Sequence, residues 1–320
     1  MAILNGQKFK LFSLGSNDSL AKELSEFTNI PLSECTVTTF ADGEVSINIE
    51  ETVREHDVFI IQSTNEPVND NYMTLLIMID ALKRASARRI NVIMPYYGYS
   101  RQDRKAKSRQ PISAKLIADL LQVAGAHRVL TMDLHASQIQ GFFNIPNDNL
   151  LAFPTIADYF KDRNFKDAVV VSPDHGGATR ARQLASALGV SMAIIDKRRP
   201  APNVAEVMGI IGKVKGKTCI IIDDMIDTAG TLTIAASALM ENGAKEVYAS
   251  CSHPIFSGPA IERIENSVLT EVVVTNTIEL NSSKLSPKIK QLSVSHVFGQ
   301  AVLNIINGEP LSGLFEVNSK

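Results

Sequence analysis

A run of β-branched apolar residues that ends in two carboxylates constrains the fold more than any other part of this chain. Residues 220–222 are all isoleucine, and Asp223 and Asp224 follow them directly. A short continuous apolar run predicts a strand that is buried on both faces, as in a parallel sheet. Residues 232–241 then read as a helix, so the segment predicts the strand–loop–helix unit of an α/β fold.

The loop between this strand and this helix, residues 227–231, consists of Asp, Thr, Ala, Gly and Thr. The first amides of a helix have no partner within the helix, so a loop of small residues that opens a helix suits a phosphate. The carboxylates of Asp223 and Asp224 can accept hydrogen bonds from sugar hydroxyls. Helix capping and tight turns are the alternative, but capping does not account for two adjacent carboxylates after an apolar strand. A site for a phosphorylated sugar is therefore favoured.

Composition bounds the class of protein. The length of 320 residues predicts two domains, and the apolar content of 45% is enough for two sizeable cores. The net charge of −2 gives no indication of binding to nucleic acid or to a membrane surface. Cys35, Cys219 and Cys251 are widely spaced and have no metal-ligand pattern, so reduced thiols are expected. Without a signal peptide or an apolar run of membrane-spanning length, the chain is expected to be cytoplasmic.

The chain also resembles itself. Residues 74–90 align with residues 231–247, and residues 21–24 align with residues 181–184 at nearly the same offset. Strand-like runs alternate with amphipathic helices in both halves, so we expect an α/β fold of two duplicated domains, each a mainly parallel sheet flanked by helices. The segment before Thr74 has neither an acidic pair nor a glycine. One sugar-phosphate site is therefore expected, in the second half.

Two segments of the first half carry their own signals. Asp42 and Gly43 form a turn signal before an alternating strand, which favours a plain hairpin. Tyrosines follow Pro95 and lead into a basic loop, defined here as residues 100–109, which holds five Arg and Lys residues. Charge runs are usually solvated, yet a basic loop after a strand can close over a polyphosphate, and the residues leave both interpretations open. The apolar face expected for the helix that follows consists of Ile112, Leu116, Ile117, Leu120, Leu121 and Ala124.

Three more strands end in polar residues. Asp133 and His135 follow an apolar run, which leaves a structural role and a metal or nucleotide role equally open. Asp174, ahead of the glycines at 176–177, either caps a helix or holds a cation. Residues 197–199 are three cations at a strand end, which suits an anionic substrate.

Together these segments resemble the ribose-phosphate diphosphokinases, also called phosphoribosyl pyrophosphate synthetases. The resemblance covers nearly the whole chain and rests on motifs in order: FADGEVSINI, YSRQDRKAKSRQPISAKL, TMDLHASQIQGFF, VSPDHGGATRAR, DKRRP, IIIDDMIDTAGT, HPIFSGPA and EVVVTNTI. The acidic segment alone would not separate this family from purine or pyrimidine phosphoribosyltransferases. The set of motifs does, because a simple phosphoribosyltransferase does not need the motifs of the first half.

The resemblance implies two domains of the phosphoribosyltransferase type I fold and a magnesium-dependent reaction. The β,γ-diphosphoryl group of ATP moves to the 1-hydroxyl of ribose 5-phosphate, giving AMP and 5-phosphoribosyl 1-diphosphate for nucleotide, histidine and tryptophan biosynthesis. Two Mg²⁺ sites and a homo-hexamer with the ATP site shared between subunits are implied as well. The domains would span residues 1–150, with the ATP motifs, and 151–304, with the sugar site, while residues 305–320 would pack back on the first.

Roles carry over by motif. The resemblance implies ATP contacts at Phe40, Asp42, Gly43, Glu44, Arg101, Gln102, Asp103 and His135. It implies ribose 5-phosphate contacts at Arg199, Asp223, Asp224, Asp227, Thr228, Ala229, Gly230 and Thr231. Lys197 and Arg199 would stabilise charge on the transferring group, and His135 and Asp174 would hold magnesium. The basic loop would be a lid.

Four positions depart from the family's usual pattern. Ala229 replaces a frequent Gly or Cys, and His175 stands where a small residue is usual. Pro310 and Thr52 stand where serines are common, so phosphate activation and ADP inhibition are not expected to follow automatically. A non-catalytic regulatory paralogue is the main alternative from another class. It is disfavoured because Lys197 and the other motif residues all persist.

Overall fold

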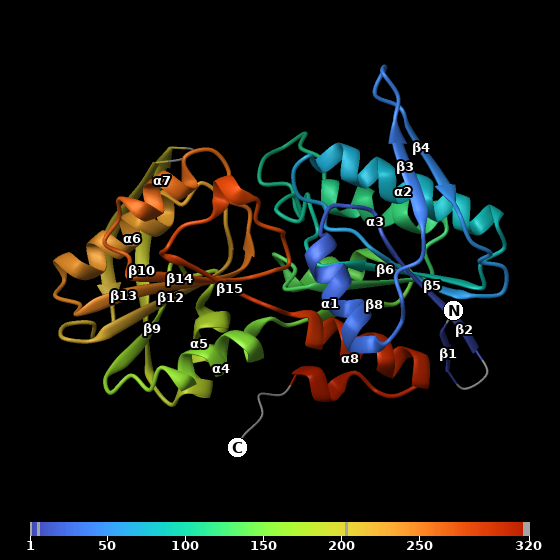
Figure 1. Ribbon diagram of the computed structural model, residues 1–320. Helices are drawn as coiled ribbons and strands as arrows, with labels where there is room; N and C mark the ends of the chain where they lie inside the picture. Colours follow the sequence, from blue (N-terminus) through green and yellow to red (C-terminus); the bar gives the residue numbers. More distant parts are fainter. Residues whose placement is uncertain (1, 5–6, 202–203, 316–320) are drawn as a thin grey trace. The chain divides into compact units, whose positions relative to one another are not determined.

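The computed structural model describes residues 2–4, 7–201 and 204–315; for residues 2–4, 7, 197–201, 204–208 and 315 it describes the backbone alone. The chain divides into two compact units (Figure 1). Unit 1 consists of the residues up to 151 together with 277–279 and 294–315, and unit 2 consists of residues 152–276 and 280–293. None of the helices in these ranges has the length and apolar character needed to cross a membrane.

Unit 1 is built on a six-stranded sheet with the order β1-β2-β5-β6-β7-β8. Its strands are β1 (Ala2–Leu4), β2 (Gln7–Ser13), β5 (Asp57–Ile61), β6 (Arg89–Met94), β7 (Arg128–Met132) and β8 (Asn147–Leu150). Only β1 is antiparallel to its neighbour, and the other pairs are parallel. All five residues of β5 are buried, which explains why this strand reads as an unbroken apolar run after its first residue.

Four helices cover the sheet of unit 1. They are α1 (Asp18–Thr28), α2 (Val68–Arg84), α3 (Ser113–Ala124) and α8 (Ser295–Asn307), with short 3-10 helices at Ser137–Phe142 and Ser312–Phe315. Figure 1 shows α2 and α3 on one side of the sheet and α1 and α8 on the other. A Cβ on Gly299 of α8 would lie 2.3 Å from the ring of Phe27 at α1, so this glycine lets the C-terminal helix pack closely within unit 1.

The apolar face expected for α3 was wrong in part. The buried residues of this helix are Ala114, Ile117, Ala118 and Leu121. Leu116 and Leu120, which had been predicted to be buried, are 58% and 39% exposed. The helix carries two apolar stripes, and the one with the small alanines faces the core because it allows the closer approach to α2 and the sheet.

A separate hairpin joins α1 to β5. Its strands, β3 (Cys35–Thr39) and β4 (Val45–Ile49), pair only with each other, in antiparallel register. Figure 1 shows the hairpin extending away from the main sheet. Cys35, Ile47 and Ile49 pack at its base against the core of unit 1, and the tip is exposed. The predicted hairpin is confirmed.

Unit 2 is built on a seven-stranded sheet with the order β11-β10-β9-β12-β13-β14-β15. The strands are β9 (Ala168–Ser172), β10 (Ser191–Ala201), β11 (Val204–Ile211), β12 (Thr218–Ile226), β13 (Glu246–Pro254), β14 (Glu271–Thr275) and β15 (Ile289–Leu292). The helices are α4 (Phe153–Asp162), α5 (Ala178–Leu188), α6 (Gly230–Glu241) and α7 (Ala260–Glu265), with a 3-10 turn at Ser282–Lys284. All pairs except β10 with β11 are parallel.

The two units repeat one topology. In unit 1 the elements follow in the order β2-α1, hairpin, β5-α2-β6-α3-β7. In unit 2 the corresponding order is β9-α5, β10-β11, β12-α6-β13-α7-β14. The corresponding central strands are also neighbours in the same order within each sheet. The aligned residues 74–90 and 231–247 therefore fall on equivalent helices and strands. The predicted fold class, a duplicated α/β fold with mainly parallel sheets, is confirmed.

Candidate active site

The acidic pair, Asp223 and Asp224, lies at the carboxyl end of β12, a central strand of unit 2. The strand continues past the isoleucines to Ile226, so the acidic pair lies among the last residues of the strand and not after it. Asp223 stands opposite Cys251 of β13. Asp224 is almost fully buried, whereas Asp223 keeps about a third of its side chain exposed. Ligands bind at this end of the strands in open parallel sheets.

Arg180 of α5 compensates the charge of the acidic pair. Its Nη1 lies 3.6 Å from Oδ1 of Asp223 and 3.8 Å from Oδ1 of Asp224. Burial and the Asp224 carboxylate raise the pKa of Asp223 well above its usual range, and Arg180 opposes this rise. The pair therefore gains from any ligand that donates hydrogen bonds to it. Arg180 was absent from the predicted site residues, although it stands in the same motif as Asp174.

The 227–231 loop is held at its start by the segment after β13. The amide of Phe256 donates to the Ile226 carbonyl at 3.1 Å, and the amide of Ser257 donates to the Asp227 carbonyl at 3.0 Å. Helix α6 begins at Gly230, and Ala229 before it adopts a left-handed conformation with φ of 58°. For an L-residue this conformation costs about 1–2 kcal/mol. The loop is therefore a fixed turn that directs the amino end of α6 toward the carboxyl edge of the sheet.

Asp174 lies in the turn between β9 and α5. Its Oδ1 accepts the amide of Gly177 at 3.0 Å, so Asp174 stabilises the turn before α5, whereas the N-cap residue of that helix is Gly177 and no side chain caps it. A Cβ on Gly177 would lie 2.9 Å from Oγ of Ser172, which explains this glycine by packing within the turn. Nearby, His175 Nε2 lies 3.2 Å from Oδ1 of Asp196, and both side chains are largely exposed.

Lys197 and Arg199 belong to β10, which pairs with β11 in antiparallel register. Lys197 stands opposite Val207. Their side chains lie outside the described part of the structure, so their predicted roles stay predictions.

In unit 1, the tip of the β3–β4 hairpin carries Phe40, Asp42, Gly43 and Glu44. The amide of Phe40 donates to the Glu44 carbonyl at 2.8 Å, and Oδ1 of Asp42 accepts the amide of Glu44 at 3.1 Å. Gly43 has a φ of 93°, a conformation that favours glycine. The Phe40 ring is 54% exposed. The turn is thus held by its own bonds, and it presents an aromatic ring without a core to pack against.

The basic loop begins at a base formed by polar groups of α2, of the turn after β5 and of the segment after β6. The Tyr72 hydroxyl donates to the Gly98 carbonyl at 2.8 Å, and Oγ1 of Thr64 accepts the Gly98 amide at 2.8 Å while its hydroxyl donates to the Tyr96 carbonyl at 2.9 Å. The Tyr97 hydroxyl donates to the Ala114 carbonyl. The tyrosine cluster is therefore structural.

Gly98→Ala is expected to destabilise unit 1. A Cβ at this position would lie 2.6 Å from the Thr64 carbonyl oxygen, and overpacking of this kind costs about 1–3 kcal/mol. We expect calorimetry to show a melting temperature about 3–8 °C lower. Gly141→Ala is the matched control because nothing lies within 4 Å of its added Cβ. Equal melting temperatures for the two variants would contradict the packing explanation.

Further along, the basic loop meets the segment that carries His135. Oδ2 of Asp103 accepts a hydrogen bond from Nε2 of Gln138 at 2.7 Å, and Gln102 accepts the Ser113 hydroxyl at 2.6 Å. His135 is exposed, between β7 and the 3-10 helix that contains Gln138. The structure thus brings together two motifs, around Asp103 and around His135, that lie about thirty residues apart in the sequence.

In unit 1, the turn after β5 corresponds to the 227–231 loop of unit 2. Its side chains are held by hydrogen bonds within unit 1. Gln62 is fully buried, and its Nε2 donates to Oδ1 of Asn71 at 3.2 Å. The Ser63 hydroxyl donates to the Thr277 carbonyl at 2.6 Å. Asn71 in turn donates to the Asn65 carbonyl at 2.8 Å. These bonds engage the polar side chains of the turn, and the single sugar-phosphate site expected in the second half stays a prediction.

The side-chain oxygen and nitrogen atoms at the site determine how magnesium could be bound. Mg²⁺ prefers oxygen ligands and keeps several waters. Asp174 fits, because it is a carboxylate whose hydrogen bond to the turn is made through Oδ1. His135 offers a ring nitrogen, which suits a phosphate contact better than Mg²⁺. In the described part of the chain, no three His, Cys, Asp or Glu side chains come together as a metal site. Such an ion would depend on substrate oxygens.

The chain has two α/β units, each built on a mainly parallel sheet. In one of them, an acidic strand end is followed by a loop that opens a helix. This arrangement defines an enzyme with the phosphoribosyltransferase type I fold. Family models agree: the N-terminal domain of ribose phosphate pyrophosphokinase matches residues 9–125, and the phosphoribosyl synthetase-associated domain matches residues 197–316. The chain belongs to the ribose-phosphate pyrophosphokinase family.

Individual relatives cover nearly the whole chain. The ribose-phosphate pyrophosphokinase of Bacillus caldolyticus is 62% identical over 309 residues, 97% of this chain and 98% of the relative. That of Bacillus subtilis is 59% identical, with the same coverage. The crystal structure of phosphoribosylpyrophosphate synthetase from Mycobacterium smegmatis has a TM-score of 0.90 at 40% identity, and the match covers 94% of this chain and all of that one. The chain is thus a transferase that makes 5-phosphoribosyl 1-diphosphate for nucleotide biosynthesis.

Proposed function

We propose that unit 2 binds the acceptor, ribose 5-phosphate, at the end of β12. The acidic pair carries the proposal: Asp223 and Asp224 would accept hydrogen bonds from the 2- and 3-hydroxyls of the sugar. Residues 227–231 would surround the 5-phosphate, where the helix dipole and the first amides of α6 favour an anion. Arg199 would contact the same phosphate. Binding of the sugar would give hydrogen-bond donors to this pair, in which burial and the neighbouring carboxylate raise the pKa of Asp223.

Unit 1 would bind the donor, ATP. Phe40 offers an exposed ring on which adenine can stack, and Asp42, Gly43 and Glu44 would contact neighbouring parts of the nucleotide. Arg101, Gln102 and His135 would contact the nucleotide as well. The hydrogen bond from Gln138 to Asp103 supports a shared role for the two motifs, because it holds one against the other. The basic loop would act as a lid.

The reaction needs position and charge neutralisation more than covalent chemistry from the protein. The 1-hydroxyl would attack the β-phosphorus of ATP, the diphosphoryl group would move to the sugar and AMP would leave. Lys197 and Arg199 would stabilise charge on the transferring group. Mg²⁺, at two sites, would neutralise phosphate charge when bound, with Asp174 as a protein ligand and His135 beside the ATP-bound ion.

Assembly and location belong to the same proposal. We infer a homo-hexamer in which the ATP site is shared between subunits, and a cytoplasmic location. The hairpin supports sharing, because its tip is exposed and, among the strands that the structure describes, β3 and β4 pair with no other. A regulatory paralogue without activity is disfavoured, because every motif residue assigned to the reaction is present.

Incubation of the protein with ATP, ribose 5-phosphate and Mg²⁺ is expected to yield AMP and 5-phosphoribosyl 1-diphosphate in equal amounts. ATP labelled in the γ-phosphate should place the label on the sugar product, because the β- and γ-phosphates move together. Reactions without sugar phosphate, or with a chelator, are the controls. Formation of ADP would contradict diphosphoryl transfer, and a lack of any turnover would favour the regulatory alternative.

A further inference from the structure

One cation of unit 2 that no motif identified lies against the 227–231 loop. Arg263, on α7, donates from Nη1 to the Thr228 carbonyl at 2.9 Å, across 35 residues of sequence. The same Nη1 lies 3.0 Å from the position that a Cβ on Gly230 would occupy. The guanidinium therefore lies directly against the backbone of the loop, and a Cβ on Gly230 would require it to shift.

This bond fixes the orientation of a whole peptide group. In a trans peptide the carbonyl of one residue and the amide of the next point in opposite directions. Because the Thr228 carbonyl points toward α7, the Ala229 amide points away from α7. An amide that points out of the loop is the kind of donor that a phosphate accepts at a helix start.

The orientation needs an anchor because the backbone beyond it is strained. Ala229 is held at φ of 58°, in the left-handed region. A flip of the Thr228–Ala229 peptide would move Ala229 toward negative φ, where L-residues are relaxed, and would turn its amide away from the ligand side. The charge-assisted hydrogen bond from Arg263 opposes that flip.

We propose that Arg263 is a positioning residue for phosphate binding: it holds the Thr228–Ala229 peptide in the orientation in which the Ala229 amide can bind the 5-phosphate of the sugar. This inference rests on the proposed binding of ribose 5-phosphate by the loop. Arg263 itself would not touch the sugar. Its loss should weaken ribose 5-phosphate binding and leave ATP binding unchanged.

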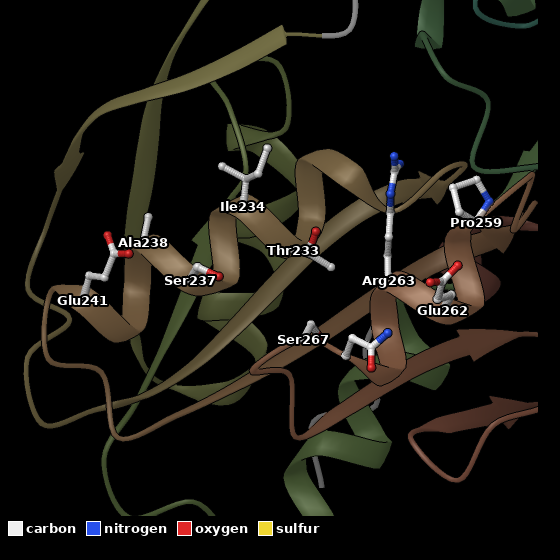
Figure 2. Close-up of a pocket in the computed structure, with 10 residues that line it drawn as sticks. Thr233, Ile234, Ser237, Ala238, Glu241, Pro259, Glu262, Arg263 and Ser267 are labelled. Carbon is white, nitrogen blue, oxygen red and sulfur yellow. The ribbon is translucent and has the colours of Figure 1, made fainter.

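The surroundings of Arg263 make a chemical test possible. Arg263 lines an open groove of about 680 Å³ between α6 and α7, together with Thr233, Ser237, Glu241 and Glu262. In Figure 2 Arg263 and Glu241 lie at opposite ends of this groove. Truncation of Arg263 would enlarge a space that is already open to solvent, so a small guanidinium ion from solution can enter it.

Arg263→Ala is expected to raise the KM for ribose 5-phosphate about tenfold, the effect of one lost charge-assisted hydrogen bond. The KM for ATP and the melting temperature should stay within twofold and about 2 °C of the parent. Calorimetric titration of ribose 5-phosphate, with a non-hydrolysable ATP analogue and Mg²⁺ present, should show the same tenfold loss. Added guanidinium or ethylguanidinium should restore part of the affinity, and Arg263→Lys should lose less than Arg263→Ala.

Two further variants separate positioning from general stability. Glu262→Gln changes the neighbouring residue of α7 in the same groove and should leave both KM values unchanged. Ala229→Gly removes the left-handed strain, so adding Arg263→Ala to it should cost only two- to threefold in ribose 5-phosphate affinity. An unchanged KM in Arg263→Ala, or an equal rise in both KM values with a lower melting temperature, would overturn the positioning role. Failure of the parent to bind ribose 5-phosphate would instead overturn the proposed function.

Discussion

Lys197→Ala is expected to lower kcat by about 100- to 1,000-fold while the affinity for ribose 5-phosphate changes little. A cation that meets charge as it develops on the transferring group contributes mainly in the transition state, and the loss of one such contact costs about this much. AMP formation at saturating substrates measures kcat, and calorimetric titration measures the affinity. The backbone of Lys197 lies in β10, where pairing with β9 and β11 does not depend on the side chain.

Lys213→Ala is the matched control for this variant, because Lys213 is an exposed lysine in the turn after β11. Its kcat should equal that of the parent. A kcat for Lys197→Ala within threefold of the parent would show that the assigned role is wrong. A tenfold or larger loss of ribose 5-phosphate affinity would point instead to ground-state binding.

Asp224→Ala is expected to raise the KM for ribose 5-phosphate about 100-fold. A hydrogen bond to a charged acceptor contributes about 1.5–3 kcal/mol, which is 10- to 150-fold in affinity. The variant also leaves Arg180 with one carboxylate where it had two, and it places an apolar group at a buried polar position. The KM for ATP should change less than threefold, because the proposed nucleotide residues lie in the other unit.

The control for this variant is Asp167→Ala. Asp167 precedes β9, at the amino end of the same sheet, and its side chain is 70% exposed beside Lys217. Steady-state kinetics with both substrates varied should show parental KM values for this control. If Asp224→Ala kept the parental KM for ribose 5-phosphate, the acidic pair would not be the sugar site.

The fold was predictable where local pattern and burial agree. The isoleucines at 220–222 indicated β12 because a strand covered on both faces must be apolar on both. The self-similarity of the chain indicated the duplication, and the equivalent helices α2 and α6 end at aligned positions, Arg84 and Glu241. The apolar pattern did not predict the buried face of α3. It showed that the helix has apolar stripes, but not which stripe packs against the core. Leu116 and Leu120 are exposed for that reason.

The site was predictable only where its residues stand in one segment. Asp223, Asp224 and the 227–231 loop are contiguous, so their chemistry could be read together. Arg180 and Arg263 come from other helices: Arg180 stands in the motif of Asp174 but nothing there indicates a contact with the acidic pair, and no motif contains Arg263. Their contacts depend on how α5 and α7 pack beside β12, which is information that spacing along the chain does not contain.

The closed counterpart of the sugar loop in unit 1 bears on how the two halves can diverge. Gln62 and Asn71 tie the turn after β5 to α2, and Thr64 in the same turn supports Gly98 at the root of the basic loop. The turn that we propose to bind a ligand in unit 2 thus corresponds, in unit 1, to a turn that supports the start of the basic loop. Exchange of residues 62–67 for the acidic segment would therefore not create a second sugar site. It would remove the hydrogen bond from the Gly98 amide to Thr64 at the start of the basic loop, so the two halves share a topology but their equivalent segments cannot be exchanged.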